Sequence, residues 1–455
     1  MASASEQLAA NMNLGVFSKA KELQKRLLFT LMILVVYRIG TFVPIPGINI
    51  DAFQAAFGSG TGGSLFERLN MFAGGAVERL GIFALNVMPY ISASIIMTLL
   101  KGSVASLKEL DKDGEQGRKQ INQYTRYLTV FLAAFQAFGI ARALQATDGT
   151  VIDPGLFFQA STVITLVGGT MFLMWLGEQV TARGVGNGVS LIIFAGIVAE
   201  LPKALFQLFG QNQTGQITEF LLIILLALFV GLSMLIVFVE RAQRRLLVRY
   251  PKRQMAGGKQ FGGENSFMPL KLNTAGVIPP IFASSLLLLP ATFGQIFVGQ
   301  DGAASGIAGT ILAYLGYGSP TYLALYGLLI IFFCYFYVPY VFKPDDVADN
   351  LRKNGGFLPG IRPGQRTAEY LSYVLSRLTF IGALYVAFVC VLPELFIAQQ
   401  GGTVPASVAM LIGGMSLLII VSVTLDTVAQ IQSHLIAHQY EGLIKKSRMR
   451  RRNKT

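Results

Sequence analysis

The sequence predicts an all-α polytopic membrane protein, and three observations support this fold class. Hydrophobic residues make up 53% of the 455-residue chain, and only 13% of the residues are charged. The apolar residues form unbroken runs and do not alternate with polar ones, which is typical of helices buried in lipid. Positive charges are concentrated in one set of the connecting loops. Together these features exclude a soluble globular domain.

Ten apolar segments have the length of about 20 residues that a helix needs to cross a hydrocarbon core roughly 30 Å thick. We expect spans at 27–43, 80–100, 127–144, 156–176, 189–209, 220–239, 275–298, 322–341, 378–398 and 404–425. Basic residues precede the first segment, and no small-residue cleavage site follows them. We therefore expect a retained span there and not a cleaved signal peptide.

The positive charges predict the orientation of the chain in the membrane. With the N-terminus in the cytoplasm, the cytoplasmic loops and tails hold all of the 37 Lys and Arg residues except Arg38, Arg68, Arg79, Arg142 and Lys203. The positive-inside rule therefore places both termini in the cytoplasm. It also explains the net charge of +13 without direct DNA binding.

A short internal repeat divides the chain into two halves. Residues 89–94 and 279–284 share the pattern Pro-x-Ile-x-Ala-Ser, and each copy lies in the second apolar segment of its half. Five spans per half is an odd number, so the halves would have opposite orientations, with matched proline-interrupted helices beside a site at the midplane. Chance similarity between two small-residue segments is the alternative. We expect halves at 1–209 and 210–425, followed by a basic tail at 426–455.

Motifs for several kinds of chemistry are missing from the sequence. It has no Gly-Lys-Ser or Gly-Lys-Thr of a phosphate-binding loop, no His-Glu-x-x-His and no Gly-x-Ser-x-Gly. His434 and His438 are the only histidines, and two imidazoles without further ligands make a weak metal site. Residues 184–188 are glycine-rich but lack the flanking strand of a dinucleotide loop, so we expect a tight turn between helices. We predict no enzymatic activity, no metal and no cofactor.

Ionisable residues are scarce in the middle of the expected spans. Arg38 lies near the outer end of its span, and Glu200 and Lys203 lie in the outer half of the fifth span. Glu178 and Arg183 lie near a cytoplasmic turn. We expect local pairing or snorkelling at these positions. The scarcity argues against an inverted-repeat secondary transporter of a small solute, which is the main alternative function, and against an intramembrane hydrolase.

Aliphatic side chains occupy the expected midplane instead. Val87 and Ile91 flank the first proline of the repeat, Val189 and Ile193 start the fifth span, and Ile281 follows the second proline pair. A conduit narrowed by such side chains would exclude water and ions when it is closed. The sequence therefore favours a pathway with an apolar constriction.

The first outer loop contains a half-apolar segment at 63–75. As a helix it would reach only about 20 Å, at ~1.5 Å per residue, which is too short to cross the membrane. It could re-enter the membrane where protein surrounds it, with glycine hinges at both ends. An amphipathic helix that lies on the outer surface is the alternative.

Two cytoplasmic loops, 240–274 and 342–377, are longer than a simple pore needs. The first holds basic residues around a glycine-rich tip, and the second has two short helical patterns that flank residues 354–364. Basic loops are normally the solvated positive side of a membrane protein. Arg362, however, lies between two Pro-Gly pairs, in a rigid turn that presents one cation at low entropic cost. We therefore expect docking surfaces in both loops.

Long motifs of a known kind recur in register over nearly the whole chain. They are Tyr37–Gly40, Phe42–Ile48, Phe72–Ala76, Met88–Met97, Gln123–Tyr127, Met174–Gln179, Gly186–Gly188, Ala275–Pro279 and Pro359–Gly364. In these motifs the chain resembles the SecY/Sec61-alpha family, the channel-forming subunits of protein translocases.

The resemblance implies ten transmembrane helices in two pseudo-symmetric, inverted five-helix halves around a central hourglass pore. It also implies a hinge between the fifth and sixth helices and a lateral opening between the second and third helices on one side and the seventh and eighth on the other. The implied function is a passive channel of the bacterial inner membrane. Such a channel passes unfolded secretory polypeptides across the membrane and releases membrane segments laterally into lipid, driven by a partner motor or the ribosome.

The resemblance also implies roles for residues of this chain. The pore ring falls on Val87, Ile91, Val189, Ile193, Ile281 and Ile419. The plug falls on 63–75, with Gly63, Leu65, Phe66, Leu69, Met71, Phe72, Gly74 and Gly75. The lateral gate includes Pro89, Ser92, Ser94, Pro279, Ser284 and Ser285. Docking of the motor and the ribosome falls on Arg249, Lys252, Arg253, Lys259, Arg352, Arg362 and Arg366.

Two features depart from the family's pattern. Two ring positions are valine where the family often has isoleucine, which would loosen the seal, and the loop tip is Gly257-Gly258-Lys259 where a denser basic cluster is expected. The implied partners are SecE and SecG, which would complete a heterotrimer, the SecA ATPase, the ribosome, secretory and membrane nascent chains with signal sequences, membrane lipids, and SecDF and YidC as accessory factors.

Overall fold

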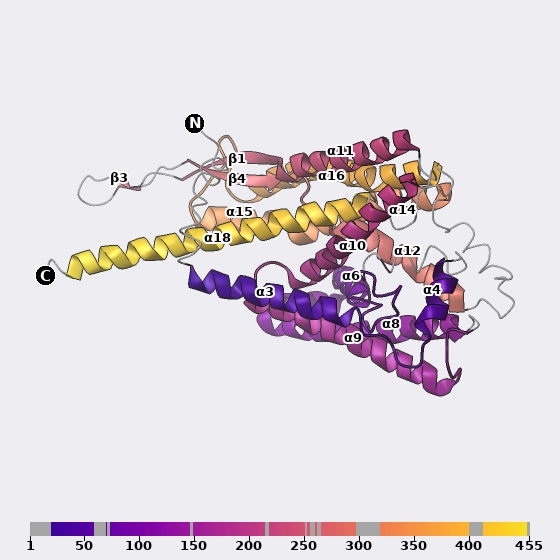
Figure 1. Cartoon of the computed structure of the whole chain (residues 1–455). Helices are drawn as coiled ribbons and strands as arrows, with labels where there is room; N and C mark the ends of the chain where they lie inside the picture. The colour runs from indigo at the N-terminus through magenta and orange to yellow at the C-terminus, as the bar shows by residue number, and fades with distance from the viewer. Residues whose placement is uncertain are drawn as a thin grey trace. The chain divides into compact units, whose positions relative to one another are not determined.

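The computed structural model shows a predominantly helical chain (Figure 1). It describes residues 20–58, 70, 73–145, 149–213, 218–250, 253–254, 260–261, 265–296, 319–399 and 413–452. The chain forms two compact units: the first comprises Met1–Lys203 and Val423–Thr455, and the second comprises Ala204–Ser422. The first unit therefore includes the C-terminal tail as well as the first spans.

The first unit is a bundle in which helices pack in pairs. The pairs are α6 with α8, α8 with α9, and α3 with α9. Small residues such as Ala133 and Ala137 are fully buried in α8, and small residues allow helices to approach closely. The helices are α3 (Lys21–Gly40), α4 (Ile50–Gly58), α6 (Met88–Ser103), α7 (Ala105–Lys112), α8 (Glu115–Gln145), α9 (Leu156–Arg183), most of α10 (Gly188–Gln213) and the larger part of α18 (Gly414–Arg452).

The second unit combines long apolar helices with a small β-structure. Helix α14 packs against both α12 and α16. The ring of Phe282 on α12 meets the rings of Phe333 and Tyr337 edge to face, with centroids 5.7 and 5.9 Å apart. The helices are α11 (Glu219–Arg241), α12 (Ile278–Ile296), α14 (Pro320–Val341), α15 (Pro344–Lys353) and α16 (Gln365–Gln399).

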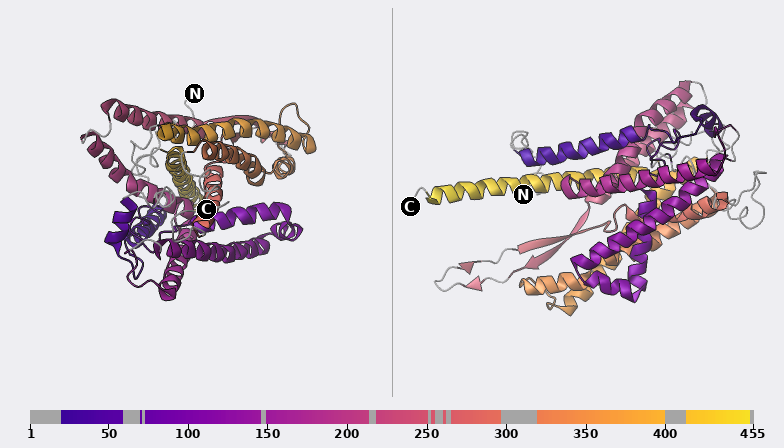
Figure 2. Two further views of the ribbon diagram at one scale, coloured as in Figure 1. Left: turned by 90° about the vertical axis from the view of Figure 1, so that its right-hand side faces the viewer. Right: turned by 90° about the horizontal axis from the view of Figure 1, so that it is seen from below.

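The loop at 240–274 contains antiparallel strands, which the all-α prediction did not include. Strand β1 (Gln243–Arg249) pairs with β4 (Asn265–Lys271), and β2 (Arg253–Gln254) pairs with β3 (Gln260–Phe261). In β1 the buried Leu246 and Val248 alternate with more exposed residues, as in a strand with one covered face. Figure 2 shows this ribbon extending away from the helices of its own unit.

The helices account for the expected membrane spans with some differences. In the described ranges, seven helices are long and apolar enough to cross a membrane, or eight if the pair α6 and α7, bent by 102°, is one span. Helix α3 and the apolar helix Ile278–Leu287 at the start of α12 coincide with the expected first and seventh spans. The fold class predicted from hydrophobic runs is therefore confirmed as mostly helical and multi-span.

The second expected span is helical only from Met88 onward. Residues 80–87, which were expected to begin this span, form turns instead. Two of these residues, Leu80 and Asn86, have left-handed φ values of 45° and 49°, which a helix cannot contain. The continuous apolar run did not reveal this break, because buried loops and buried helices can have the same hydrophobicity.

The two copies of the internal repeat begin helices in the same way. Helix α6 begins one residue before Pro89, and α12 begins one residue before Pro279. Two residues before each helix, Asn86 and Gly276 both have a left-handed φ, 49° and 67°. The prolines therefore lie in the first turns of these helices, where the backbone N–H that proline lacks would have no helical partner in any case. The expectation that they interrupt helices was wrong.

Two further helices differ in extent from the expectation. Helix α18 continues without a break from Gly414 to Arg452, so the basic tail at 426–455 is largely an extension of the last span. The second helical pattern of the 342–377 loop is the beginning of α16, which runs for 35 residues from Gln365. The first pattern forms a separate helix, α15, as expected.

Candidate functional site

The turn between α9 and α10 fixes the start of the helix that carries Val189 and Ile193. The side-chain oxygen of Asn187 accepts hydrogen bonds from the backbone N–H groups of Val189 and Ser190, at 3.1 and 3.3 Å. This is the arrangement of an N-cap, which satisfies N–H groups that the helix itself cannot pair. Gly186 has a φ of 91°. The tight turn expected at 184–188 is therefore confirmed.

Side chains from three helices, one of them α9 itself, hold this turn. Thr30 of α3, Thr181 of α9 and Gln430 of α18 accept hydrogen bonds from backbone N–H groups of the turn, at 3.1, 2.9 and 2.8 Å. Each bond satisfies a backbone donor that would be costly to leave unpaired in an apolar setting. Sequence reasoning missed these residues, because an isolated Thr or Gln in a helix gives no pattern that identifies its partner.

The start of α6 is fixed by a buried non-helical stretch, residues 73–87, which we call the stalk segment. Backbone hydrogen bonds of 2.8 and 2.9 Å join it to residues 43–45. A Cβ added at Gly81 would lie 2.7 Å from the carbonyl oxygen of Thr41. One added at Gly169 of α9 would overlap the carbonyl oxygen of Ile82. Only glycine fits such close backbone approaches.

The residues of the expected ring all lie at the starts of helices. Val87 directly precedes α6, Ile91 and Ile281 lie in the first turns of α6 and α12, and Ile419 lies in the second turn of α18. Val189 and Ile193 lie in the first two turns of α10. Four of these residues belong to the first unit, whereas Ile281 and Ile419 belong to the second. Their role as a pore ring stays a prediction.

The expected plug is described only at its C-terminal end. Gly74 and Gly75 lie in the stalk segment and have left-handed φ values of 62° and 79°. A Cβ at Gly74 would lie 2.9 Å from the Cα of Gly196 on α10, so the backbone at this point packs directly on that helix. The other plug residues, Gly63, Leu65, Phe66, Leu69, Met71 and Phe72, lie outside the described residues.

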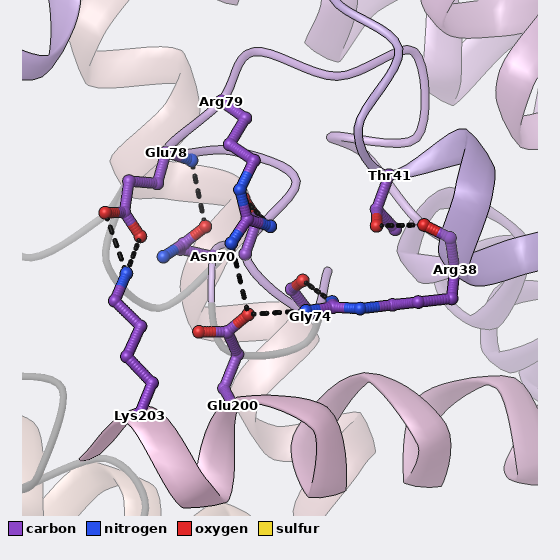
Figure 3. Close-up of polar contacts among 9 residues, drawn as sticks. Arg38, Thr41, Asn70, Gly74, Glu78, Arg79, Glu200 and Lys203 are labelled. Atoms are coloured by element: carbon purple, nitrogen blue, oxygen red, sulfur yellow. Dashed lines mark hydrogen bonds and ion pairs between the residues drawn. The ribbon is translucent and has the colours of Figure 1, made fainter. Parts of the chain in front are cut away.

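Ionisable residues near the end of α3 and in the middle of α10 pair with one another and with the stalk segment (Figure 3). Arg38 lies 3.4 Å from a carboxylate oxygen of Glu200. The Nζ of Lys203 lies 2.6 and 2.8 Å from the two carboxylate oxygens of Glu78. The local pairing expected for these spans is therefore confirmed. Sequence reasoning did not identify Glu78 as a partner, because a charge in a loop gives no sign of the residue it faces.

The expected gate residues lie in two helix pairs, one in each unit. Ser92 and Ser94 lie on α6, which packs on α8, and Ser284 and Ser285 lie on α12, which packs on α14. Ser92 and Ser285 are buried, whereas Ser94 and Ser284 are partly exposed. Pro89 and Pro279 start the two helices. The opening of a gate between these pairs stays a prediction.

The two long loops of the second unit form one surface. Arg249, at the end of β1, exchanges two backbone hydrogen bonds of 2.9 and 3.0 Å with Phe357 of the other loop. A Cβ at Gly356 would lie 2.9 Å from the ring of Tyr250, so the loops are in close contact. The sequence predicted two separate docking loops, because backbone pairing over about a hundred residues leaves no local signal.

The turn that carries Arg362 is rigid, as its sequence predicts. A backbone hydrogen bond of 3.1 Å from Ile361 to Leu358 closes the turn. Gly360 and Gly364 have left-handed φ values of 84° and 102°, which non-glycine residues rarely adopt. Leu358 is buried and anchors the turn, whereas the Arg362 side chain is exposed.

The cations of this surface differ in their pairing. Arg352 lies 3.4 Å from Asp349 on α15. Arg249, Arg362 and Arg366 are exposed, and their guanidinium groups have no polar partner within the described part of the chain. Lys252 and Lys259 lie outside the described residues, as does the side chain of Arg253.

Known proteins resemble this chain over almost its full length. The SecY family model matches residues 81–428. The protein translocase subunit SecY of Rickettsia conorii is 47% identical over 440 residues, which cover 95% of this chain and 99% of the relative. The SecY subunit of Escherichia coli K12 is 48% identical over 432 residues, which cover 94% of this chain and 95% of the relative.

Solved structures share the fold at lower identity. One is a SecY channel in which the plug domain stabilises the closed state and maintains a membrane seal, with a TM-score of 0.64 and 18% identity. Another is Sec61 from the canine ribosome–channel complex of the endoplasmic reticulum, with a TM-score of 0.61 and 18% identity. Each alignment covers 90% of this chain and 92% of the other. The layout of ten helices in two halves is consistent with these folds.

Proposed function

This chain belongs to the SecY family, and we propose on that basis that it forms a protein-conducting channel in the bacterial cytoplasmic membrane. The channel passes unfolded secretory polypeptides across the membrane and releases membrane segments sideways into lipid. None of the relatives described above supports the alternative of a small-solute transporter. The sequence contains no motif for binding a nucleotide, so a partner supplies the driving force.

The observation that carries this proposal is the buried stalk segment in the first unit. Irregular backbone at membrane depth is tolerated only where protein buries it or where it lines a cavity. The stalk segment connects the expected plug with Val87 and Ile91 at the start of α6, and its glycines fix it against neighbouring backbone. This arrangement supports a re-entrant plug beside the pore over a helix that lies on the membrane surface.

We place the constriction of the pore at the six expected ring residues. They are aliphatic and lie at the starts of α6, α10, α12 and α18. A narrow apolar ring excludes water and ions from the closed pore. The two valines, Val87 and Val189, make the ring slightly wider than six isoleucines would.

The sideways exit for membrane segments lies, in this proposal, between two helix pairs. One pair is α6 with α8, and the other is α12 with α14; each pair packs internally within its own unit. Separation of the pairs then needs no rupture of either one. Ser92, Ser94, Ser284 and Ser285 line the exit beside Pro89 and Pro279.

The surface formed by the two long loops is the proposed docking site for cytosolic partners. A solved relative of similar fold was determined in a complex with the ribosome, and three exposed arginines of this surface have free guanidinium groups in the described part of the chain. We propose that the ribosome and the SecA motor bind here, and that SecE and SecG complete the complex. The distribution of Lys and Arg supports a cytoplasmic position for both termini.

The ring is tested by making it polar. Replacing Ile91 and Ile281 together with Asn should admit water to the closed pore. We expect higher resting ion conductance in planar bilayers and faster translocation of precursors with defective signal sequences. The control is Asn at Ile164 and Ile381, which are 72% and 51% exposed on α9 and α16. Parental conductance of the Ile91 and Ile281 variant at normal protein levels would contradict the ring.

A further inference from the structure

Five ionised side chains connect α3, α10 and the stalk segment, and we call them the polar latch. They are Arg38 of α3, Glu78 and Arg79 of the stalk segment, and Glu200 and Lys203 of α10 (Figure 3). Glu200 lies 3.4 Å from Arg38 and 3.9 Å from Arg79, and it therefore bridges two cations. Lys203 and Glu78 form a second, closer pair at 2.6 Å.

The ring of Phe42 completes the latch. The guanidinium groups of Arg38 and Arg79 lie 5.0 and 4.4 Å from its centroid, close enough for cation–π attraction. Two like charges on one ring repel each other, and the Glu200 carboxylate between them offsets that repulsion. Glu200 is only 14% exposed, so solvent and salt screen its interactions less than those of a surface pair.

The latch holds the backbone of the stalk segment as well as its side chains. Arg38 donates a hydrogen bond to the carbonyl oxygen of Gly74, and Arg79 donates one of 3.4 Å to that of Gly75. The side chain of Asn70 accepts a hydrogen bond of 2.9 Å from the N–H group of Glu78. Both ends of the bend between residues 70 and 79 are therefore fixed at the point where the expected plug ends.

The same helix carries the latch and part of the expected ring. Val189 and Ile193 lie in the first two turns of α10, and Glu200 lies about 10 Å further along, at ~1.5 Å per residue from Ile193. Pro202 lies inside the helix between the two latch residues of α10, and a proline there removes one helical hydrogen bond and makes bending easier. A movement of α10 that widens the ring therefore acts directly on the contacts that hold the stalk segment.

From this geometry we propose that the polar latch holds the plug in the closed channel and that its strength sets how readily the plug leaves. The inference rests on the proposed function of 63–75 as a plug. Its residues are positioning residues, which act on the plug through the stalk segment. Opening requires the stalk segment to leave α10 or α10 to move with it.

The first test removes the bridging charge with Glu200→Gln. Arg38 and Arg79 then lose their shared carboxylate while the shape of the side chain is kept. We expect the resting conductance in planar bilayers to rise about threefold to tenfold, as the closed state loses one partly buried ion-pair network. Translocation of a precursor with a defective signal sequence should rise with it.

A charge exchange separates a latch from a merely structural contact. Glu78→Lys and Lys203→Glu each place like charges together, and each should raise the resting conductance. The double exchange restores an ion pair, and its conductance should return toward the parental value. If the pair does not act through attraction, the fold increases of the two single variants should multiply in the double variant. A resting conductance of the double variant at or above that product would overturn the latch.

The matched control is an ion pair of the same unit that does not touch the stalk segment. Arg126 of α8 and Glu178 of α9 lie 2.6 Å apart and are more exposed. Glu178→Gln removes a charge from this pair by the same chemical change, and we expect parental conductance. A rise as large as that of Glu200→Gln would mean that any lost ion pair loosens the channel, and the latch would be wrong.

Cysteines at Phe66 and Ile91 report separately on the plug. A cross-link between them that forms in the idle parental channel and is lost in the occupied one supports the plug. If Glu200→Gln then changes neither this cross-link nor the conductance, the latch is wrong although the plug is right. If the parental channel shows no cross-link that depends on its state, both are wrong. A cross-link weakened in the idle Glu200→Gln channel, with raised conductance, supports the latch.

Discussion

The arginines of the polar latch differ from Arg249, Arg362 and Arg366 of the docking surface in their pairing and in their exposure. Arg38 and Arg79 both lie within 4 Å of the Glu200 carboxylate. Arg362, on its rigid turn, has no polar side-chain partner among the described residues and is exposed. Composition and hydropathy do not distinguish these groups. The structure therefore separates cations that hold the protein together from cations that are available to a partner.

This difference has a physical reason. An arginine that is already paired with a carboxylate of its own chain gains little binding free energy from a carboxylate of a partner, because the two carboxylates compete for the same guanidinium group. A free guanidinium on a fixed turn loses little entropy when it binds, and its planar donors suit an acidic partner. Charge changes in the latch should therefore alter closure, and charge changes on the docking surface should alter partner binding.

The largest effect is expected for Arg362→Glu. Reversing the one cation that the Pro-Gly pairs hold in place puts like charges together at the docking contact, and we expect ATP-driven translocation to fall at least about tenfold. Arg362→Lys should be only partly tolerated, because an ammonium group cannot make the same paired hydrogen bonds. Translocation of a secretory precursor into vesicles with equal amounts of each variant measures both effects.

Insertion and resting conductance are the controls for these variants. Both should stay parental, since the Arg362 side chain is exposed and has no polar partner in the described part of the chain. If Arg362→Glu translocates at the parental rate, the turn is not a docking contact.

The next effect concerns the backbone that the latch fixes. Gly74→Ala introduces a Cβ 2.9 Å from the backbone of Gly196 at a left-handed φ, and we expect a loss of about 2–4 kcal/mol in the free energy of unfolding. Gly114→Ala is the matched variant, because Gly114 has a φ of 72° but nothing lies near its Cβ position. It should lose only about 1 kcal/mol. Denaturation of the purified proteins in detergent compares the two, and equal losses would show that contact with α10 is unimportant.

The smallest effect is expected for Arg352→Glu. Arg352 lies on the same surface as Arg362, but it is exposed and pairs with Asp349, and such surface pairs contribute about 0–1 kcal/mol. Translocation should stay within about twofold of the parental rate. Damage equal to that of Arg362→Glu would mean that the surface acts through its total positive charge.

The sequence predicted features that repeat along the chain, and it missed those that depend on distant partners. Hydrophobic runs predicted the helices, and the glycines at 184–188 predicted a tight turn that the structure confirms. The pairing of Arg249 with Phe357 and the bridge from Glu200 to Arg79 join residues over a hundred positions apart. Local sequence patterns do not predict such contacts. The left-handed residues Leu80 and Asn86 broke an apolar run that hydropathy treats as continuous.

The central claim is that a plug closes this channel and leaves it when a polypeptide enters. Cysteines at Phe66 and Ile91, in a background where the buried Cys334 and Cys390 are replaced, test it most directly. We predict a cross-link in the idle channel that is lost when a secretory chain is arrested inside, and none with either cysteine alone. A cross-link of equal yield in the idle and the occupied channel would contradict the claim and favour a helix that stays on the membrane surface.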